Sequence, residues 1–475
     1  MEPTKYTNLR NLIGGKLKGS ETSVEILNPS TEKTITHCPM ASMEDFEIAV
    51  ASARDIFPSW SKDKKLRISV LNSIAEILIK NIEILATALS MELGLPYSTS
   101  VDEVKMASLF FKNRASASDK VETLYDNEKQ KVDVVRKPIG VVGAIIPWNA
   151  PLMVLSEKVA TSMAMGNTVI LKTSPLAPLT CLLFAKIISD CVPQGAISIM
   201  CGDESVGRGM VNDKRIGMIS FTGSTHVGMQ IMAEGAKTLK RLSLELGGND
   251  AAIVLPDVQI EKVVSNIFWG AFYRTGQVCT AIKRLYVHGD IYNSFVDALV
   301  DKASSATLGG PFDKNVTLGP VSNKSQFDKF NNIVKESINK GGKVACGGKE
   351  RNREGYFFEP TVVIDVNPDN PLVVKEQFGP AIPIVKYENI NDAVKHANRS
   401  DYGLGGSVWG ADSEKAEAIA CQLEAGTVWV NRHAMVSPDI PFGGFKHSGV
   451  GRANGSVGLD SYSEIQTVSV NKRNR

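Results

Sequence analysis

The chain has 475 residues, of which 43% are hydrophobic and 22% are charged. Such a length and composition are typical of a globular protein with room for two or more cores. The 53 Lys and Arg residues stand against 51 Asp and Glu, which leaves a net charge of +2. A balance so near zero, without a long basic block, argues against nucleic acid as a partner.

Two further compositional features bear on location. No run of about 18 apolar residues is present, and Met1 to Arg10 lack the charged and apolar regions of a secretory signal, so we expect no membrane partner. The 7 cysteines are widely scattered, without a C-x-x-C pair. This usage favours a reduced, cytoplasmic setting and argues against a zinc or other metal site.

The first third of the chain shows apolar residues at helical spacing. A capping box at Ser42 and Asp45 begins a helix that Pro58 should end. A second helix is predicted over 66–81, and a third stops at Gly94. None of these helices carries residues with obvious chemistry.

From Lys131 onward, short apolar strands alternate with helical patterns. The apolar stretch 139–146 is typical of a strand that is buried on both faces. This alternation predicts an α/β fold with a parallel, doubly wound sheet, and the tail after Leu459 alternates like an edge strand that would invite another subunit. The glycines of 402–406 are predicted to mark a turn. Further strands are predicted at 168–171, 197–201, 217–221, 242–246 and 251–255, and a helix over 258–273 opens a second α/β region.

One glycine-containing segment, 221–228, follows a predicted strand and precedes a helical run. Gly223 would let the backbone approach a phosphate, and the following helix would offer free N–H groups. The segment lacks the G-x-G-x-x-G fingerprint, so an ordinary βα turn explains it equally well when it is taken alone.

Cys279 is the first of three residues that could carry chemistry. It lies among small and polar neighbours, where modest lowering of a thiol pKa of about 8.5 would give a nucleophilic thiolate. Taken alone, it is better explained as an inert loop cysteine. The 6 histidines show no grouping that would activate it, which argues against a cysteine hydrolase, and His433 is expected to be an exposed loop residue.

Glu245 and Asn149 are the other two. Glu245 interrupts an apolar strand, and burial there would raise its pKa and suit it to accept a proton near neutral pH. A single glutamate in a strand is more simply explained as exposed to solvent. Asn149 ends another strand and is either an amide donor to an oxyanion or a plain turn former.

Several strings in the right order resemble the aldehyde dehydrogenase superfamily over nearly the whole chain. The resemblance implies an α/β fold with a Rossmann-type cofactor domain, an α/β catalytic domain and a small β extension. It also implies oxidation of an aldehyde to a carboxylic acid with NAD or NADP, through a cysteine thiohemiacetal and a thioester that water hydrolyses. The strings are Pro147-Trp148-Asn149, Gly166 to Lys172, Phe221 to Gly228, Glu245 to Asn249, Gly276 to Cys279, Glu376 to Pro380, and Pro441 to Gly449.

The resemblance assigns the site residue by residue. Cys279 would be the nucleophile, Glu245 would activate the hydrolytic water, and the Asn149 amide would hold the oxyanion together with the Cys279 N–H. Pro175 stands where many NAD-preferring members carry a glutamate, so NAD is expected and NADP is possible. The implied cofactor-binding residues are Trp148 and Phe378, which shape the cleft, Lys172 and Glu376 at the two riboses, and Gly223 and Ser224 at the pyrophosphate.

The same resemblance implies a substrate tunnel. Ala150 and Glu157 stand where large aromatic residues are frequent, so we expect a wide tunnel that admits a bulky aldehyde. An ionised Glu157 would disfavour acidic semialdehydes; alternatively it turns outward or pairs with a lysine such as Lys158, and then says nothing about specificity. The implied tunnel residues are Ala150, Glu157, Tyr273, Val278, Val436 and Phe442.

The resemblance also divides the chain. It implies a dinucleotide-binding domain at 1–117 and 138–247, a catalytic domain at 248–446, and an oligomerisation extension at 118–137 and 463–475. We therefore expect a homodimer or homotetramer. Two alternatives remain: a coenzyme-A-acylating aldehyde dehydrogenase, against which Glu245 argues, and a non-catalytic dinucleotide-binding or structural protein, against which the three catalytic residues argue.

Overall fold

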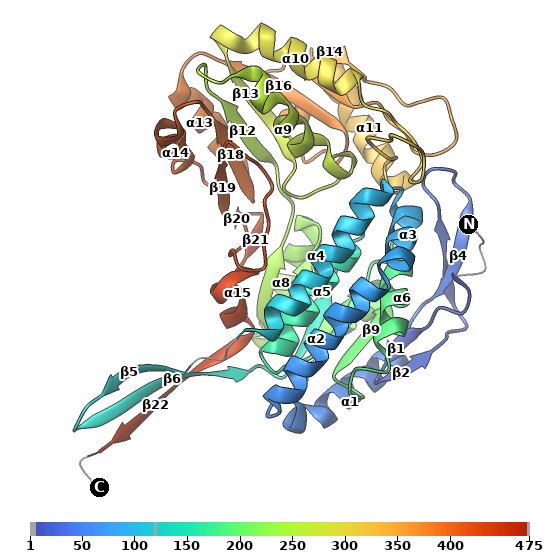
Figure 1. The fold of residues 1–475 in the computed structure, drawn as a ribbon, viewed down its shortest axis with the longest axis vertical. Helices are drawn as coiled ribbons and strands as arrows, with labels where there is room; N and C mark the ends of the chain where they lie inside the picture. Colours follow the sequence, from blue (N-terminus) through green and yellow to red (C-terminus); the bar gives the residue numbers. More distant parts are fainter. Residues whose placement is uncertain (1–5, 118–120, 473–475) are drawn as a thin grey trace.

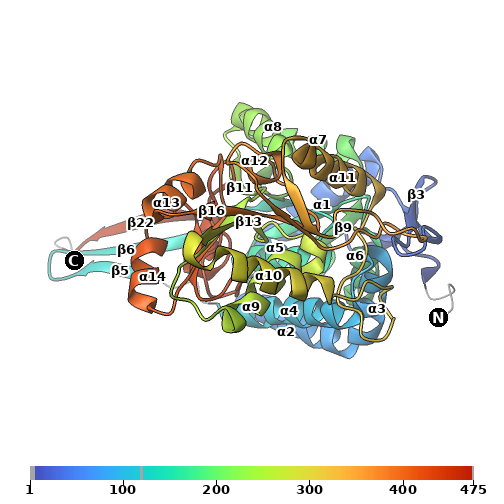
Figure 2. The same cartoon turned by 90° about the horizontal axis from the view of Figure 1, so that it is seen from above.

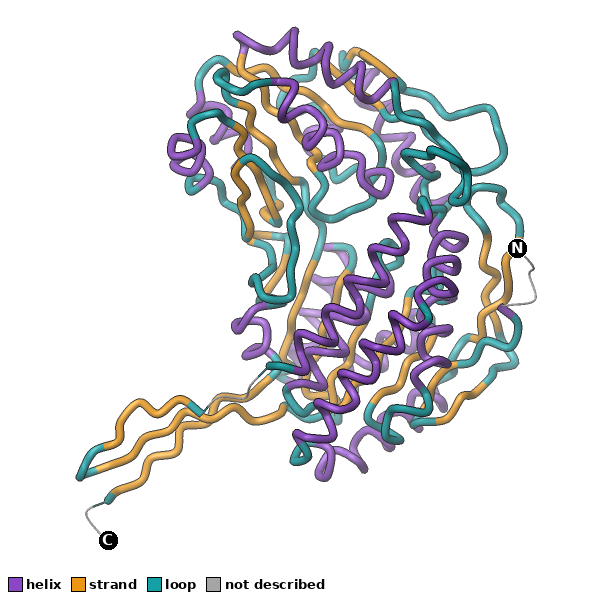
Figure 3. Tube along the Cα trace, viewed as in Figure 1, coloured by secondary structure: helices purple, strands orange, loops and turns teal. Residues whose placement is uncertain are grey.

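The protein is built on two large sheets with helices on both faces, and a narrow three-stranded arm projects from one side (Figure 1 and Figure 3). The computed structural model describes residues 6–117 and 121–472. Seen from above, the arm lies at the opposite end of the molecule from β3 (Figure 2). Among the described residues, no helix is both long and apolar enough to cross a membrane.

The first sheet has its parallel strands in the order β9-β8-β7-β10-β11. The chain runs from β7 outward to β9, and then returns to the other side of β7 to form β10. Such a reversal is the switch point at which doubly wound sheets bind ligands, outside the carboxyl ends of their strands. The predicted sheet is confirmed. Its strands are β7 (Val141–Ile145), β8 (Thr168–Thr173), β9 (Ile197–Cys201), β10 (Ile216–Thr222) and β11 (Arg241–Glu245), with β1 (Asn11–Ile13), β2 (Lys16–Lys18) and β21 (Gly449–Val450) at its edges.

Helices cover both faces of this sheet, and each face has its own apolar core. One face carries α5 and α6, with α2, α3 and α4 outside them; the other carries α1, α7 and α8 (Figure 2). The helices are α1 (Met43–Trp60), α2 (Lys64–Lys80), α3 (Ile82–Leu93), α4 (Tyr97–Ala115), α5 (Pro151–Ala164), α6 (Leu179–Ile188), α7 (Glu204–Asn212) and α8 (Thr225–Gly235).

The capping box predicted at the start of α1 is confirmed, because Ser42 and Asp45 each bond the other's backbone N–H. The predicted end at Pro58 is wrong, since α1 continues to Trp60. A proline in the last turn removes only one backbone hydrogen bond. Trp60 is buried and donates from Nε1 to the Asn167 carbonyl at 2.9 Å, which holds the final turn in place.

The second sheet has the order β14-β15-β16-β13-β12-β18-β19 and is parallel except for β14. Helices α9 and α10 cover one face, and α11 to α14 cover the other. Its strands are β12 (Asp250–Val254), β13 (Ile282–His288), β14 (Lys343–Cys346), β15 (Thr361–Ile364), β16 (Ala381–Tyr387), β18 (Gly405–Trp409) and β19 (Thr427–Val430). Its helices are α9 (Ile260–Phe272), α10 (Tyr292–Ser304), α11 (Lys324–Asn339), α12 (Pro371–Val374), α13 (Ile390–Asn398) and α14 (Ser413–Ala420).

The turn predicted at 402–406 is a single bend at Leu404, between β17 (Tyr402–Gly403) and β18. Glycine is needed at position 405 because the neighbouring side chain leaves no room for a Cβ atom. A Cβ on Gly405 would lie 2.3 Å from Asp250 Oδ2, so only glycine lets β18 pass this carboxylate.

The arm consists of β5 (Glu122–Asp126), β6 (Gln130–Pro138) and β22 (Ser463–Asn471). Strand β22 follows α15 (Gly455–Ser461) and pairs with β6 along its whole length, which confirms the strand predicted in the tail. The predicted extension also includes 118–120 and 473–475, which lie outside the described residues. The division into domains stays a prediction.

Candidate active site

Four of the residues singled out from the sequence lie at strand ends or on loops where the two sheets meet. Asn149 follows β7, and Glu245 is the last residue of β11. From the second sheet, Cys279 precedes β13 and Glu376 precedes β16. The carboxyl ends of the first sheet's strands thus face loops of the second.

Asn149 and the loop of Cys279 are in direct contact. Asn149 Nδ2 donates to the Gln277 carbonyl at 2.9 Å. Because a side-chain amide carries two N–H donors, the second remains available for a ligand oxygen. Cys279 as a whole residue is partly exposed to solvent.

The surroundings of Cys279 raise the pKa of its thiol to about 12, first through burial and then through the charges of Asp250, Glu376 and Glu245. Lys283 acts in the opposite direction. These surroundings do not lower the thiol pKa, as formation of a thiolate would require. The thiol holds its proton at neutral pH, and a nucleophilic thiolate needs a base to take that proton.

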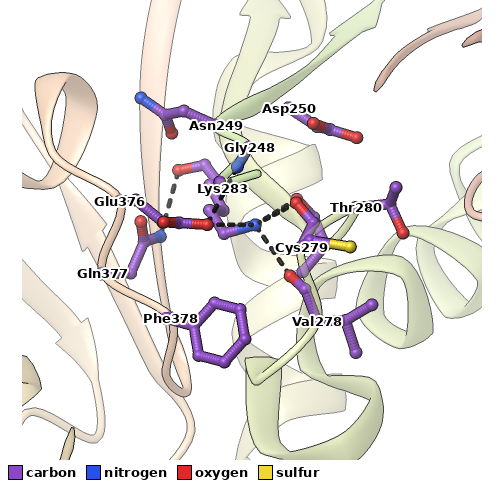
Figure 4. Close-up of polar contacts among 12 residues, drawn as sticks. Gly248, Asn249, Asp250, Val278, Cys279, Thr280, Lys283, Glu376, Gln377 and Phe378 are labelled. Atoms are coloured by element: carbon purple, nitrogen blue, oxygen red, sulfur yellow. Dashed lines mark hydrogen bonds and ion pairs between the residues drawn. The ribbon is translucent and has the colours of Figure 1, made fainter. Parts of the chain in front are cut away.

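Lys283 was missed in the sequence, and Figure 4 shows its ammonium between Glu376 and the carbonyls of Val278 and Cys279. Its buried Nζ donates to the carbonyls of Val278 and Cys279 at 2.8 and 2.7 Å, and lies 4.0 Å from Glu376 Oε1. The ammonium therefore fixes the backbone of the cysteine and joins it to the loop of Glu376. A lysine inside the buried strand 282–288 was the available signal.

Glu245 is buried, with 5% of its surface exposed, so the simpler interpretation of an exposed strand residue is wrong. Neither carboxylate oxygen has a well-formed hydrogen bond among the described residues. Burial and the charge of Glu157 raise its pKa to about 8, against the opposing effect of Lys158 and Arg452. A Cβ on Gly443 would lie 3.0 Å from Oε1, so this glycine leaves space beside the carboxylate.

The predicted cofactor residues line the switch point and the facing loop. The rings of Trp148 and Phe378 meet edge to face, with centroids 5.6 Å apart. Ser224 caps α8, accepting from the Val227 N–H at 3.3 Å, and a Cβ on Gly223 would lie 2.4 Å from the Phe221 ring.

Lys172 and Glu376 lie at either side of this region. Lys172 is buried at the carboxyl end of β8, and burial lowers its pKa. Glu376 Oε1 accepts from the Gly248 N–H at 3.0 Å, while a Cβ on Gly247 would lie 2.6 Å from Oε2. Glycines therefore keep open the space beside the carboxylate. A cation, a carboxylate and a helix N-terminus are the groups that suit the hydroxyls and phosphates of a dinucleotide.

The six predicted tunnel residues are only partly brought together. Ala150 and Val278 are next to Asn149 and Cys279 in the chain, and Glu157 lies on α5 with Oε2 at 3.6 Å from Lys158 Nζ. This ion pair favours the interpretation in which Glu157 does not affect substrate specificity. Tyr273 begins a 3₁₀ helix that precedes Cys279, whereas Val436 and Phe442 lie in the loop between β19 and β20. The tunnel stays a prediction.

His433 was expected to be exposed, and this is wrong, because its side chain is fully buried. Trp409 Nε1, which can only donate, bonds Ser407 Oγ at 2.9 Å. The Ser407 proton is then directed at His433 Nδ1, 2.9 Å away, so Nε2 carries the ring proton and donates to the Thr280 carbonyl at 2.8 Å. Burial lowers the pKa of His433 to about 3, so the ring is neutral and supports the residue after Cys279.

No group of three or more His, Cys, Asp or Glu side chains suitable for a metal occurs within 6–117 and 121–472. The fold is that of an NAD(P)-dependent oxidoreductase built on two α/β sheets.

Known proteins agree with this class. The sequence profile of the Aldehyde dehydrogenase family matches residues 17–468. Aldehyde dehydrogenase LUC3 from Fusarium sp is 36% identical, with 98% of this chain and 100% of that protein aligned. The NAD+ complex of an aldehyde dehydrogenase from Bacillus cereus is 32% identical, with a TM-score of 0.96 over 99% of both chains. An NADP dependent enzyme of E. coli is 28% identical, with a TM-score of 0.95 over 98% of this chain and 99% of that one. The chain belongs to the aldehyde dehydrogenase family.

Proposed function

We propose that the protein oxidises an aldehyde to a carboxylic acid with NAD(P)+, through a thioester on Cys279 that water hydrolyses. The observation that carries this proposal is the joint placement of three groups. A cysteine loop is bonded to the Asn149 amide, and the buried Glu245 carboxylate ends a strand of the neighbouring sheet. A coenzyme-A-acylating enzyme would have less need of such a base.

The first step forms a bond between Cys279 Sγ and the aldehyde carbon. Because the thiol pKa is about 12, its proton has to be taken by a base as the bond forms. The carbonyl oxygen becomes negative, and the free N–H of Asn149 stabilises it together with the backbone N–H of Cys279. The product is a thiohemiacetal on Cys279.

The residues of the switch point fit a dinucleotide, which supplies a ring that accepts the hydride from this thiohemiacetal. Lys172 and Glu376 would bind its ribose hydroxyls, and Gly223 and Ser224 its pyrophosphate. Trp148 and Phe378 would close the cleft around it. Pro175 provides no carboxylate to repel a 2′-phosphate, so we propose NAD as the cofactor with NADP also accepted.

Glu245 would then serve hydrolysis of the thioester. With a pKa of about 8, its carboxylate can take a proton from water near neutral pH. The attack of that water breaks the C–S bond and returns the thiol. Neither oxygen has a well-formed hydrogen bond among the described residues, which leaves both free to accept a proton from the water.

We further propose that the arm joins subunits into a homodimer or homotetramer in the cytoplasm. Apolar side chains on the arm, such as Leu124, Tyr125 and Ile465, are more than half exposed. All seven cysteines, each within the described residues, are free, as in a reducing compartment.

Purified protein should be given a panel of aliphatic, aromatic and charged aldehydes with NAD+ or NADP+, without coenzyme A. The proposal predicts reduced cofactor together with one carboxylic acid per turnover. Activity that appears only after coenzyme A is added would instead establish the acylating reaction. Dinucleotide binding without turnover in any combination would leave an aldehyde outside the panel or a non-catalytic role, and the ranking of aldehydes would test the wide tunnel.

A further inference from the structure

A buried ion pair lies beside the proposed site and has no part in the chemistry above. Arg274 Nη1 donates to Glu103 Oε2 at 2.5 Å, and the two side chains are 6% and 1% exposed. Arg274 stands in the loop that leads to Cys279, whereas Glu103 lies on α4. Burying two charges costs desolvation that their attraction often fails to recover, so the pair calls for an explanation other than stability.

The second oxygen of Glu103 holds the start of α5. Oε1 accepts from the N–H groups of Leu152 and Met153 at 3.0 and 3.1 Å. Helix α5 begins directly after Asn149-Ala150 and has no side-chain cap of its own. A carboxylate at a helix N-terminus satisfies free N–H groups and suits the helix dipole. Glu103 therefore fixes the helix that follows Asn149.

The second terminal nitrogen of Arg274 holds Asn149 itself. Nη2 donates to the Asn149 carbonyl at 2.6 Å. The Asn149 side chain donates to the Gln277 carbonyl at 2.9 Å, and Gln277 Nε2 donates back to the Arg274 carbonyl at 3.1 Å. Each residue thus uses its side chain to hold the backbone of the next, in a closed ring. The ring ties the loop of Asn149 to the loop of Cys279.

The backbone conformation of the loop before Cys279 also indicates that it is held firmly in place. Arg274 and Thr275 have φ values of 53° and 60°, followed by Gly276 at 73°. Two successive residues other than glycine in the left-handed region cost energy, and they persist where the surrounding contacts over-determine them. The ring and the ion pair supply such contacts.

We propose that Arg274, neutralised by Glu103, is a positioning residue of the oxyanion site: it fixes the backbone of Asn149 so that the amide points at the carbonyl oxygen bound at Cys279. The inference rests on the proposed function. A planar guanidinium can donate to a carboxylate and a carbonyl at once, whereas a lysine ammonium is a compact point charge on a flexible stem. Arg274→Lys keeps the positive charge but loses the planar guanidinium that donates to both acceptors.

The test is the rate of the first turnover, measured by stopped flow as reduced cofactor at saturating aldehyde. Arg274→Lys should slow this first turnover about 10-fold to 100-fold and leave the dissociation constant of the dinucleotide unchanged, since a misplaced donor stabilises the oxyanion poorly. A first turnover at the wild-type rate would overturn the inference. No reduced cofactor from wild-type protein would instead remove the proposed function.

Arg67→Lys is the matched control. Arg67 is also a buried arginine, and its Nη1 donates to the carbonyls of Trp60 and Ser61 at 3.1 and 2.8 Å, on the helix α2 side of the fold. Arg67 lies on α2, and both carbonyls that it bonds are at the end of α1. Its first turnover should match the wild type, and an equal loss in both variants would attribute the effect of Arg274→Lys to a general loss of packing.

A double-mutant cycle shows whether Arg274 acts through Asn149. In an Asn149→Ala background, Arg274→Lys should slow the first turnover by less than about 2-fold, because the donor that it positions is already gone. A full additional loss in this background would contradict the inference.

Arg274→Met leaves Glu103 buried without its partner, and such a change can prevent folding. The double variant Arg274→Met with Glu103→Gln removes both charges and keeps an acceptor for the N–H groups of α5. We expect its thermal midpoint to be close to that of the wild type while its first turnover stays slow. Recovery of both properties would show that the pair is structural only.

Discussion

Two buried glutamates, Glu103 and Glu245, have the same chemistry and opposite surroundings. Both are about 95% buried, with 4% and 5% of their surface exposed. Glu103 uses one oxygen for Arg274 and the other for two backbone N–H groups. Glu245 has no well-formed hydrogen bond on either oxygen, and its pKa is raised to about 8.

The difference in hydrogen bonding between the two glutamates gives their buried carboxylates different roles. A carboxylate with all its partners in place is a structural anchor, because moving it would break several bonds at once. A carboxylate without well-formed hydrogen bonds is poised to exchange a proton, because burial and a neighbouring negative charge bring its pKa near the working pH. Glu103 thus fixes the site, and Glu245 would act in it.

The largest expected effect comes from removing the group that both glutamates serve. Cys279→Ala should lower turnover by more than about 10⁴-fold, because no covalent intermediate can form. Dinucleotide binding, measured by calorimetry, should stay intact. Appreciable remaining turnover would remove Cys279 as the nucleophile.

Glu245→Gln should slow hydrolysis of the thioester about 10²-fold to 10⁴-fold, the range for loss of a general base. Hydride transfer should be affected less, so stopped flow should show a burst of reduced cofactor followed by a slow phase. Glu103→Gln is the natural contrast and should give no such accumulation. A slowed first turnover without a burst in Glu245→Gln would assign Glu245 to activation of the thiol.

The pH dependence of stability and of turnover tests the role of Glu245 further. The folded pKa of Glu245, about 8, lies above its ordinary value of 4.5, so the folded protein holds a proton that the unfolded chain has released. Glu245 therefore lowers the free energy of unfolding as pH rises from 4.5 to about 8, while hydrolysis speeds up toward the upper end as the carboxylate forms. Denaturant titrations and turnover across this range should both become flatter in Glu245→Gln. Unchanged profiles would show that Glu245 does not titrate there.

The smallest effect concerns Glu157. Because its carboxylate lies 3.6 Å from the buried Lys158 ammonium, Glu157→Gln should change the ratio of kcat/KM for acidic and neutral aldehydes by less than about 3-fold. A gain of about 10-fold or more for acidic semialdehydes would show that an ionised Glu157 faces the substrate.

The sequence predicted those features that depend on neighbours along the chain. The capping box of α1, the buried strand β7 and the tail strand β22 follow from local spacing, and all three are confirmed. The end of α1 could not be predicted, since it depends on a bond from Trp60 to Asn167.

The residues that support the site could not be predicted either, because they too depend on contacts between distant parts of the chain. A loop histidine next to Arg432 looks exposed until β18 and the cysteine loop enclose it, as happens to His433. The contact between Arg274 and Glu103 joins residues 171 positions apart, and no local pattern encodes it. Motif resemblance found the residues that would react, whereas those that hold them appeared only with the tertiary contacts.

The most direct test of the account is to trap the covalent intermediate. Glu245→Gln protein should be mixed with an aldehyde and NAD+, quenched in acid within the burst, and analysed by mass spectrometry after digestion. We predict an acyl group on the peptide that contains Cys279, which disappears in the Cys279→Ala/Glu245→Gln protein. Formation of carboxylic acid without any adduct on Cys279, or an adduct on another cysteine, would contradict the account.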